Sequence, residues 1–294
     1  MVWVWLILGV SWAQESSIKV DQEKAPMVDL DIGVIPDDVA DIARAVANKP
    51  LAVRMKAISD AFLGVPYVVN GNGEGVGPDT DPPARYDVFD CLTVIEEVLA
   101  LAYAGDPVSA PMWRNAIRYQ DGVPAYQNRH HFMLAEWIPA NIAAGFFEDI
   151  THTLGETHRV EKTVTKSTWA NWRGTRSFDI PIDDLPTGTY GINVLSLDAA
   201  LQAVDKIPPG AIILTLRRSD SWRPIIVKHV GFMVPSDVRP TMRHATMMSG
   251  GQVKDHSLVW YLNHVRWYKY AIEGITVLMP LEQGPRRVLV ETGE

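Results

Sequence analysis

The hydrophobic pattern changes its period along the chain, and this change restricts the fold more than any other feature. Apolar residues recur at helical spacing in 36–63 and 91–104, and again in a shorter stretch at 195–206. The last third consists instead of short apolar or alternating segments between turn residues. Helices that precede strands indicate an α+β domain with an antiparallel sheet, because alternating βαβ units would mix the two periods.

Five segments of the last third have the length and composition of strands. They are 211–216, 225–234, 241–247, 275–279 and 287–290. We expect the second and third of these to pair across the turn between Pro235 and Pro240. The Gly-rich stretch 70–78 is expected to be a loop, and 108–175 to mix short helical pieces with loops.

Composition limits the class of protein. Of the 294 residues, 47% are hydrophobic, which is enough for a sizeable core, and we expect one domain at 35–294. The net charge is −8, from 35 acidic and 27 basic residues. A protein that binds nucleic acid would present a basic face, so nucleic acid is not an expected partner.

The first 13 residues are apolar, carry no charged side chain and end in Ser11-Trp12-Ala13, a small-x-small cleavage pattern. We interpret 1–13 as a truncated signal peptide, since the stretch has no basic start, and 14–34 as an N-terminal extension. An ordinary buried segment is the alternative. The run is shorter than the roughly 20 apolar residues that span a bilayer. We therefore expect an exported protein, periplasmic or secreted, without a transmembrane anchor after signal removal.

Cys91 is the single cysteine of the chain, and it lies where a loop runs into the helical pattern of 91–104. The free backbone N–H groups and the dipole at a helix start favour a thiolate, which is the nucleophilic form. A small buried hydrophobe is the alternative for a lone Cys. In an exported protein, however, a single Cys cannot form an internal disulfide, so an unpaired thiol there is a candidate nucleophile.

Two histidines in expected strands, His229 and His244, supply partners for the thiol. Cysteine catalysis needs an imidazole to move the proton and a third polar group to orient that imidazole. If their strands pair, both rings can lie on one face; a core histidine is the alternative for His229. The remaining histidines follow no metal-ligand spacing, so we expect no metal site and place most of them on the surface or in loops: His130, His131, His152, His158, His256 and His264.

Four segments, in this order, resemble motifs of the NlpC-type peptidoglycan hydrolases, which are bacterial papain-like cysteine peptidases. They are Phe62-Leu-Gly-Val-Pro-Tyr-Val, Phe89-Asp-Cys-Leu-Thr-Val-Ile-Glu, Lys228-His-Val-Gly-Phe-Met-Val and Arg243-His-Ala-Thr. Stretches within 117–122, 128–137 and 244–253 resemble the N-acetylmuramoyl-L-alanine amidase-like branch of that group. The resemblance runs from about residue 55 to about residue 280. It implies a papain-like α+β fold, with the N-terminal helices packed on a C-terminal antiparallel sheet.

The resemblance also implies roles for individual residues. Cys91 would be the nucleophile, His229 the general base and His244 the group that orients the base. Tyr67 would lie beside the nucleophile, where it polarises the scissile carbonyl or holds the shape of the site; a core aromatic on a turn is the alternative. The residues that would line the substrate cleft are Arg129, His130, His131 and Trp137, with a structural role for Arg129 left open.

The function that the resemblance implies is cleavage of the amide between N-acetylmuramic acid and L-alanine, in peptidoglycan or its muropeptide fragments. No metal or organic cofactor would be required. Two alternatives stay open: an endopeptidase that cuts the stem peptide between γ-D-glutamate and the diamino acid, and a non-catalytic peptidoglycan-binding protein. The 10 Trp residues would suit sugar stacking in the second case.

Three features depart from the family pattern. Leu92 follows the nucleophile where the branch usually has a small or polar residue, and Ala211 stands where the family tends to have Gly-Asp. The stretch 216–224 matches no family segment. None of these includes the three proposed reacting residues, so the departures bear on substrate preference, which loops determine.

Overall fold

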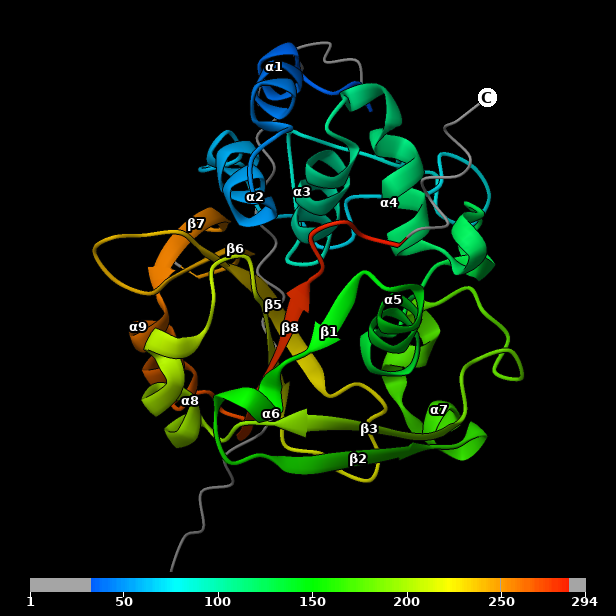
Figure 1. Cartoon of the computed structure of the whole chain (residues 1–294). Helices are drawn as coiled ribbons and strands as arrows, with labels where there is room; N and C mark the ends of the chain where they lie inside the picture. Colours follow the sequence, from blue (N-terminus) through cyan, green and yellow to red (C-terminus); the bar gives the residue numbers. More distant parts are fainter. Residues whose placement is uncertain (1–32, 249, 286–294) are drawn as a thin grey trace, which may run out of the picture. The chain divides into compact units, whose positions relative to one another are not determined.

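A six-stranded antiparallel sheet with the strand order β1-β8-β4-β5-β6-β7 forms the centre of the fold (Figure 1). The computed structural model describes residues 33–248 and 250–285. The strands of this sheet are β1 Phe147–Asp149, β4 Ile212–Arg217, β5 Val227–Val234, β6 Thr241–Thr246, β7 Gln252–Ser257 and β8 Ile272–Pro280. A separate two-stranded antiparallel sheet pairs β2 (His158–Val164) with β3 (Gly188–Val194).

The helices precede, interrupt and follow these strands. They are α1 Asp37–Val46, α2 Leu51–Asp60, α3 Thr93–Ala104, α4 Ala110–Arg118, α5 Ile138–Ala144, α6 Thr151–Leu154, α7 Lys166–Asn171, α8 Leu197–Ala203 and α9 Leu258–Val265. A π-helical turn, η4 (Met133–Trp137), leads directly into α5. Within residues 33–248 and 250–285, we find no helix with the length and hydropathy needed to cross a membrane.

The two faces of the sheet pack against different helices. Along β4, Ile212 and Leu214 belong to the core that includes α1 to α4, whereas Ile213 belongs to the core that includes α8 and α9. On β5, Phe232 and Met233 divide in the same way. This alternation follows from the two-residue period of a strand. It leaves α3, which follows Cys91, packed against β5.

The predicted α+β class is confirmed, and most predicted elements are present. Helices occur in 36–63, 91–104 and 195–206, and the expected strands at 211–216, 225–234, 241–247 and 275–279 all lie in the central sheet. The pairing of β5 with β6 is also confirmed. The expected strand at 287–290 and the signal peptide at 1–13 lie outside the described residues, as does most of 14–34.

The prediction for 108–175 was incomplete, because this region contains β1 and β2 as well as helices. The sequence analysis also missed β3, β7 and α9. Two of the missed strands carry weak signals: β1 has three residues, and in β7 only Val253 is fully buried. A strand with polar residues on both faces has no apolar alternation from which to predict it.

Four buried charged side chains join α3 to α4. Glu97 pairs with Arg114 at 2.8 Å and with Arg118 at 3.4 Å, and Glu96 pairs with Arg118 at 2.6 Å. Tyr86 donates its hydroxyl to Glu97 at 3.1 Å. None of the four charged side chains is more than 6% exposed. Since an unpaired buried ion is costly, this network fixes the packing of the two helices.

We expect Glu97→Ala to lower the free energy of unfolding by about 3–5 kcal/mol, because it leaves two buried guanidinium groups with one carboxylate. Urea denaturation followed by circular dichroism measures this change. Asp41→Ala is the matched control, since Asp41 forms an exposed pair with Arg44, and its effect should stay below about 1 kcal/mol. Equal small effects of the two substitutions would contradict a stabilising role for the network.

Candidate active site

Asp90 places Cys91 at the start of the α3 helix. Its carboxylate Oδ1 accepts the N–H of Leu92 at 2.9 Å and that of Thr93 at 2.8 Å. The N–H of Asp90 in turn donates to the Thr93 hydroxyl at 2.9 Å. These reciprocal bonds form a helix cap, with Cys91 as the first residue after the capping residue. The Asp-Cys-x-Thr motif is therefore a capping motif that fixes the thiol at the helix N-terminus.

The thiol of Cys91 lies beside the part of β5 that is no longer paired with β6. The ladder between the two strands ends at the pair Phe232 and Arg243. The N–H of Met233 donates to the carbonyl oxygen of Ala211, the residue before β4. Because successive amides of a strand point to opposite sides, those of the even-numbered β5 residues point toward β6. The next such amide beyond the ladder, that of Val230, faces the thiol of Cys91 and lowers its pKa, as does the amide of Cys91 itself. The nucleophile candidate thus lies against the residue that follows His229.

The two predicted histidines are brought together as expected. His229 lies on β5 and His244 on β6, and Nε2 of His229 is 2.6 Å from Nδ1 of His244. His244 is completely buried. A third histidine, which the sequence analysis did not connect with this pair, joins them: His256 lies on β7, partly exposed, with its Nδ1 2.8 Å from Nε2 of His244. Three imidazoles therefore form one hydrogen-bonded chain.

Local backbone features explain why the first two rings can approach so closely. A Cβ at Gly231 would lie 2.9 Å from Cβ of His244 and 2.9 Å from the carbonyl oxygen of Arg243. Any larger residue at this position would therefore displace His244. Lys228 forms a β-bulge in the pairing of β5 with β4. Bulges redirect neighbouring side chains, and this one immediately precedes His229. The His-Val-Gly motif thus has a steric basis.

Burial favours the neutral forms of the thiol and the imidazole, and so opposes the effect of the helix start, which favours a thiolate. Burial raises the pKa of Cys91 to about 12, and the adjacent Asp90 charge adds to the rise, although the Val230 amide opposes it. Burial lowers the pKa of His229 to about 4, with the Lys228 charge adding to the fall. Two amides of the helix start are taken by the Asp90 carboxylate, so little of their field is left for the thiol.

His229 keeps one ring nitrogen for the thiol. Its Nε2 is engaged by His244, which leaves Nδ1 as the nitrogen that can accept a proton. In the described part of the chain, Sγ of Cys91 and the ring of His229 share no hydrogen bond. Such contacts are commonly long in a free enzyme and tighten when substrate binds.

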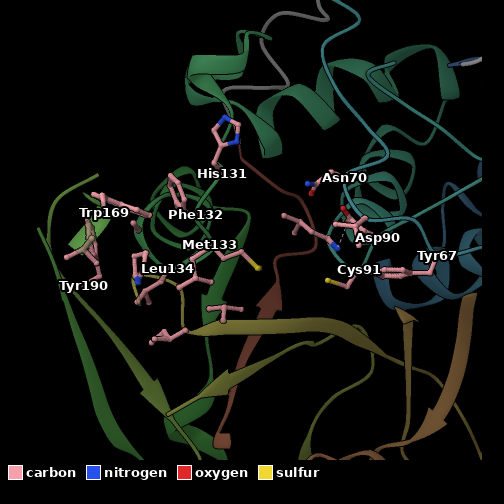
Figure 2. Close-up of a pocket in the computed structure, with 18 residues that line it drawn as sticks. Tyr67, Asn70, Asp90, Cys91, His131, Phe132, Met133, Leu134, Trp169 and Tyr190 are labelled. Carbon is pink, nitrogen blue, oxygen red and sulfur yellow. Dashed lines mark hydrogen bonds between the residues drawn. The ribbon is translucent and has the colours of Figure 1, made fainter. Parts of the chain in front are cut away.

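A cavity of about 290 Å³ opens beside Cys91 and is mostly apolar. Figure 2 shows Tyr67, Asp90 and Cys91 on one side of it and Phe132, Leu134, Trp169 and Tyr190 on the other. Burial raises the pKa of the Tyr67 phenol, and the nearby Cys91 and Asp90 add to the rise. Tyr67 therefore stays a hydrogen-bond donor at neutral pH.

A second cavity, of about 470 Å³, continues from the first and is polar. The residues that line both cavities are Asn70, Asp90, Leu92 and His131. The second cavity is otherwise lined by charged and polar groups, among them Asp79, Asp81, Arg118, Arg129, His130 and Asp179. The two cavities form a two-lobed cleft, with the nucleophile candidate on the apolar lobe close to their junction.

The structure places four of the five predicted cleft residues on the cleft and one away from it. Tyr67 lines the apolar lobe, His130 and Arg129 line the polar lobe, and His131 lines both. The prediction for Trp137 was wrong: it is completely buried, lines neither lobe, and donates its indole N–H to Glu96 at 3.0 Å. A buried indole needs such an acceptor, which is why this ring faces inward.

Arg129 combines a cleft position with a structural role. Its guanidinium pairs with both carboxylate oxygens of Glu74, each at 2.7 Å, and with Asp79 at 3.0 Å. These bonds tie the loop of 70–81 to the wall of the polar lobe. Across residues 33–248 and 250–285, no cluster of three His, Cys, Asp or Glu side chains is arranged to hold a metal ion.

We expect the rate of Cys91 alkylation by iodoacetamide to rise about tenfold per pH unit between pH 6 and pH 9, without a plateau, because thiolate is the reactive form and its pKa lies near 12. Intact-mass measurements give this rate directly, since the chain has one Cys. A cysteine-containing peptide is the control and should level off above about pH 8.5. A rate that is constant from pH 6 to pH 8 would show a preformed thiolate and contradict the neutral pair.

Solved structures with this fold come from several bacteria. A Legionella pneumophila protein of the family DUF1460 is 25% identical, with a TM-score of 0.73, over 85% of this chain and 95% of that one. An N-acetylmuramoyl-L-alanine amidase from Bacteroides uniformis is 22% identical, with a TM-score of 0.62, over 78% of this chain and 98% of that one. A Bacteroides fragilis protein described as a candidate xylanase is 20% identical, with a TM-score of 0.59, over 75% and 98% of the two chains.

Curated protein sequences contain no match to this chain. The sequence pattern of the family described as N-acetylmuramoyl-L-alanine amidase-like matches residues 57–269. That range includes the capped thiol, all three linked imidazoles and nearly every residue of the cleft. The chain therefore belongs to the N-acetylmuramoyl-L-alanine amidase-like family.

Proposed function

We propose that this chain is an exported bacterial cysteine amidase with an NlpC-type papain-like fold, and that it cleaves the amide between N-acetylmuramic acid and L-alanine. One observation carries the proposal: the thiol of Cys91 lies against the amide next to His229, and Nε2 of His229 is 2.6 Å from Nδ1 of His244. The family supports a peptidoglycan substrate and an amide bond. Export rests on the pattern of residues 1–13, which lie outside the described residues.

The neutral pair sets the order of the chemical steps. His229 accepts the thiol proton at Nδ1 as Sγ of Cys91 bonds to the amide carbonyl carbon. The tetrahedral intermediate collapses when His229 gives this proton to the amine of L-alanine, and the C–N bond breaks. Water then attacks the muramyl thioester, with His229 again as base, and releases the acid and the free thiol. Protons and bonds balance over the cycle without another reactant.

Two donors are placed for the oxyanion of the intermediate. In the described part of the chain, the N–H of Cys91 has no oxygen acceptor, and it lies at the N-terminus of α3. The neutral Tyr67 hydroxyl lies on the same side of the cleft (Figure 2). We assign both to the carbonyl oxygen of the scissile amide.

The two lobes suit the two halves of the substrate. We assign the muramyl group to the apolar lobe, where the half-buried Tyr190 can offer its ring to the C–H face of a sugar. We assign the stem peptide to the polar lobe, where Asp81, His130 and Asp179 can bind its charged and amide groups. The scissile amide would then cross the junction of the lobes beside Cys91.

We expect the wild-type protein to release free stem peptide that begins at L-alanine from purified muropeptides, and Cys91→Ala to be slower by about 10⁴-fold or more. Mass spectrometry of the products measures both. Circular dichroism of the variant is the control for folding, since a small side chain replaces a thiol. Asp41→Ala, distant from the cleft and exposed, should match the wild type.

Other products would revise the proposal in defined ways. A cut between γ-D-glutamate and the diamino acid would keep the thiol mechanism and correct the bond to that of an endopeptidase. Binding of muropeptides without any cut would favour the non-catalytic protein. Full activity of Cys91→Ala would contradict the nucleophile.

A further inference from the structure

The chain of imidazoles continues from His244 to His256. In the register of β6 with β7, His244 lies opposite Lys254, and His256 is its diagonal neighbour, which a long side chain can reach. The ring of His256 stacks on Trp260 of α9, with centroids 4.5 Å apart and planes 28° apart. It is partly exposed, whereas His244 is completely buried. The buried ring of His244 therefore lies between two partly exposed rings, His229 and His256.

Hydrogen bonding between neutral imidazoles leaves two proton arrangements. Each ring carries one proton, and each of the two contacts uses one N–H. In the outward arrangement, Nε2–H of His229 donates to His244, and Nε2–H of His244 donates to His256. In the inward arrangement all donors are reversed, and Nδ1 of His229 carries a proton. Only the outward arrangement leaves a lone pair on Nδ1 of His229 for the thiol.

We propose that His256 is a positioning residue for the base: by accepting the hydrogen bond from Nε2–H of His244, it fixes the rings of His244 and His229 in the outward arrangement. Without that acceptor, Nε2–H of His244 would be buried and unpaired, which is unfavourable for a polar group. The opposite tautomer of His244, or a turned orientation of its ring, would then become more stable than the original state. The reversed tautomer makes His244 the donor to Nε2 of His229 and leaves the proton of His229 on Nδ1, whereas turning the ring breaks the contact.

His256 lies away from both lobes of the cleft, so its effect on turnover must pass through the other two rings. The charged and titratable groups around it are His244 of β6, His264 of α9, and Lys254 and Asp255 of its own strand. Burial lowers the pKa of His256, and the positive neighbours add to the fall. A neutral ring at this place keeps the acceptor that the proposal requires.

The direct test is the protonation of the ring nitrogens, read from long-range ¹H–¹⁵N spectra of the ¹⁵N-labelled protein without substrate. We expect the wild type to carry its protons on Nε2 of His229 and His244. His256→Asn should keep this pattern, because its Oδ1 can stand in the place of the ring Nδ1. His256→Ala should shift His244 to the other tautomer or to a mixture.

The kinetic test rests on the proposed function and uses the muropeptides as substrate. We expect His256→Ala to lower kcat by about 10–100-fold, with KM within about twofold, and His256→Asn to restore most of kcat. His264→Ala is the matched control: the ring of His264 also stacks on Trp260, with centroids 4.8 Å apart, but among the described residues it shares no hydrogen bond with the three linked imidazoles, so its loss should leave kcat unchanged.

The two tests separate the ways in which the idea can fail. A proton on Nδ1 of His229 in the wild type would overturn it, as would an unchanged tautomer of His244 in His256→Ala. Equal loss of kcat in the Ala and Asn variants would also overturn it, since ring packing would then be the cause. If His256→Ala does not fold, the ring protonation of the wild type and the tautomers and kcat of His256→Asn still test the proposal. The spectra need no substrate, so a wrong substrate leaves them interpretable.

Discussion

The approach of the Val230 amide to the thiol of Cys91 is the contact on which the site depends. It exists because the ladder between β5 and β6 ends at Phe232, which leaves the next amide on that side without a strand partner. Helix α3 brings its capped N-terminus to this amide and packs on β5. The nucleophile from the N-terminal helices and the imidazoles from the C-terminal sheet therefore meet through one backbone group.

Burial, and not the helix dipole, decides the protonation of the pair. Burial raises the pKa of Cys91 to about 12 and lowers that of His229 to about 4, so a separated thiolate and imidazolium are unfavourable in the free protein. We therefore expect proton transfer to accompany the attack of sulfur on the carbonyl. A substrate that excludes water and supplies the carbonyl thus completes the site.

Sequence reasoning located the thiol and two imidazoles because each lies in a short motif with a local purpose: Asp90 caps the helix, and Gly231 makes room for His244. It missed His256 because β7 is a polar strand, so nothing in its pattern aligned that ring with β6. It misplaced Trp137 because the indole's partner, Glu96, lies 41 residues away in the chain. Contacts that depend on long-range packing leave no local periodicity from which to predict them.

The central claim is that Cys91 attacks the muramyl carbonyl, and trapping the acyl-enzyme tests it most directly. The protein is mixed with muropeptide, quenched in acid within milliseconds to seconds, digested and examined by mass spectrometry. The account predicts a thioester on the Cys91 peptide whose added mass is that of the glycan-linked muramyl group, lost again on hydrolysis. A stem-peptide acyl group on Cys91 would contradict the assigned bond, and stem release with an acyl group on another residue would contradict the nucleophile.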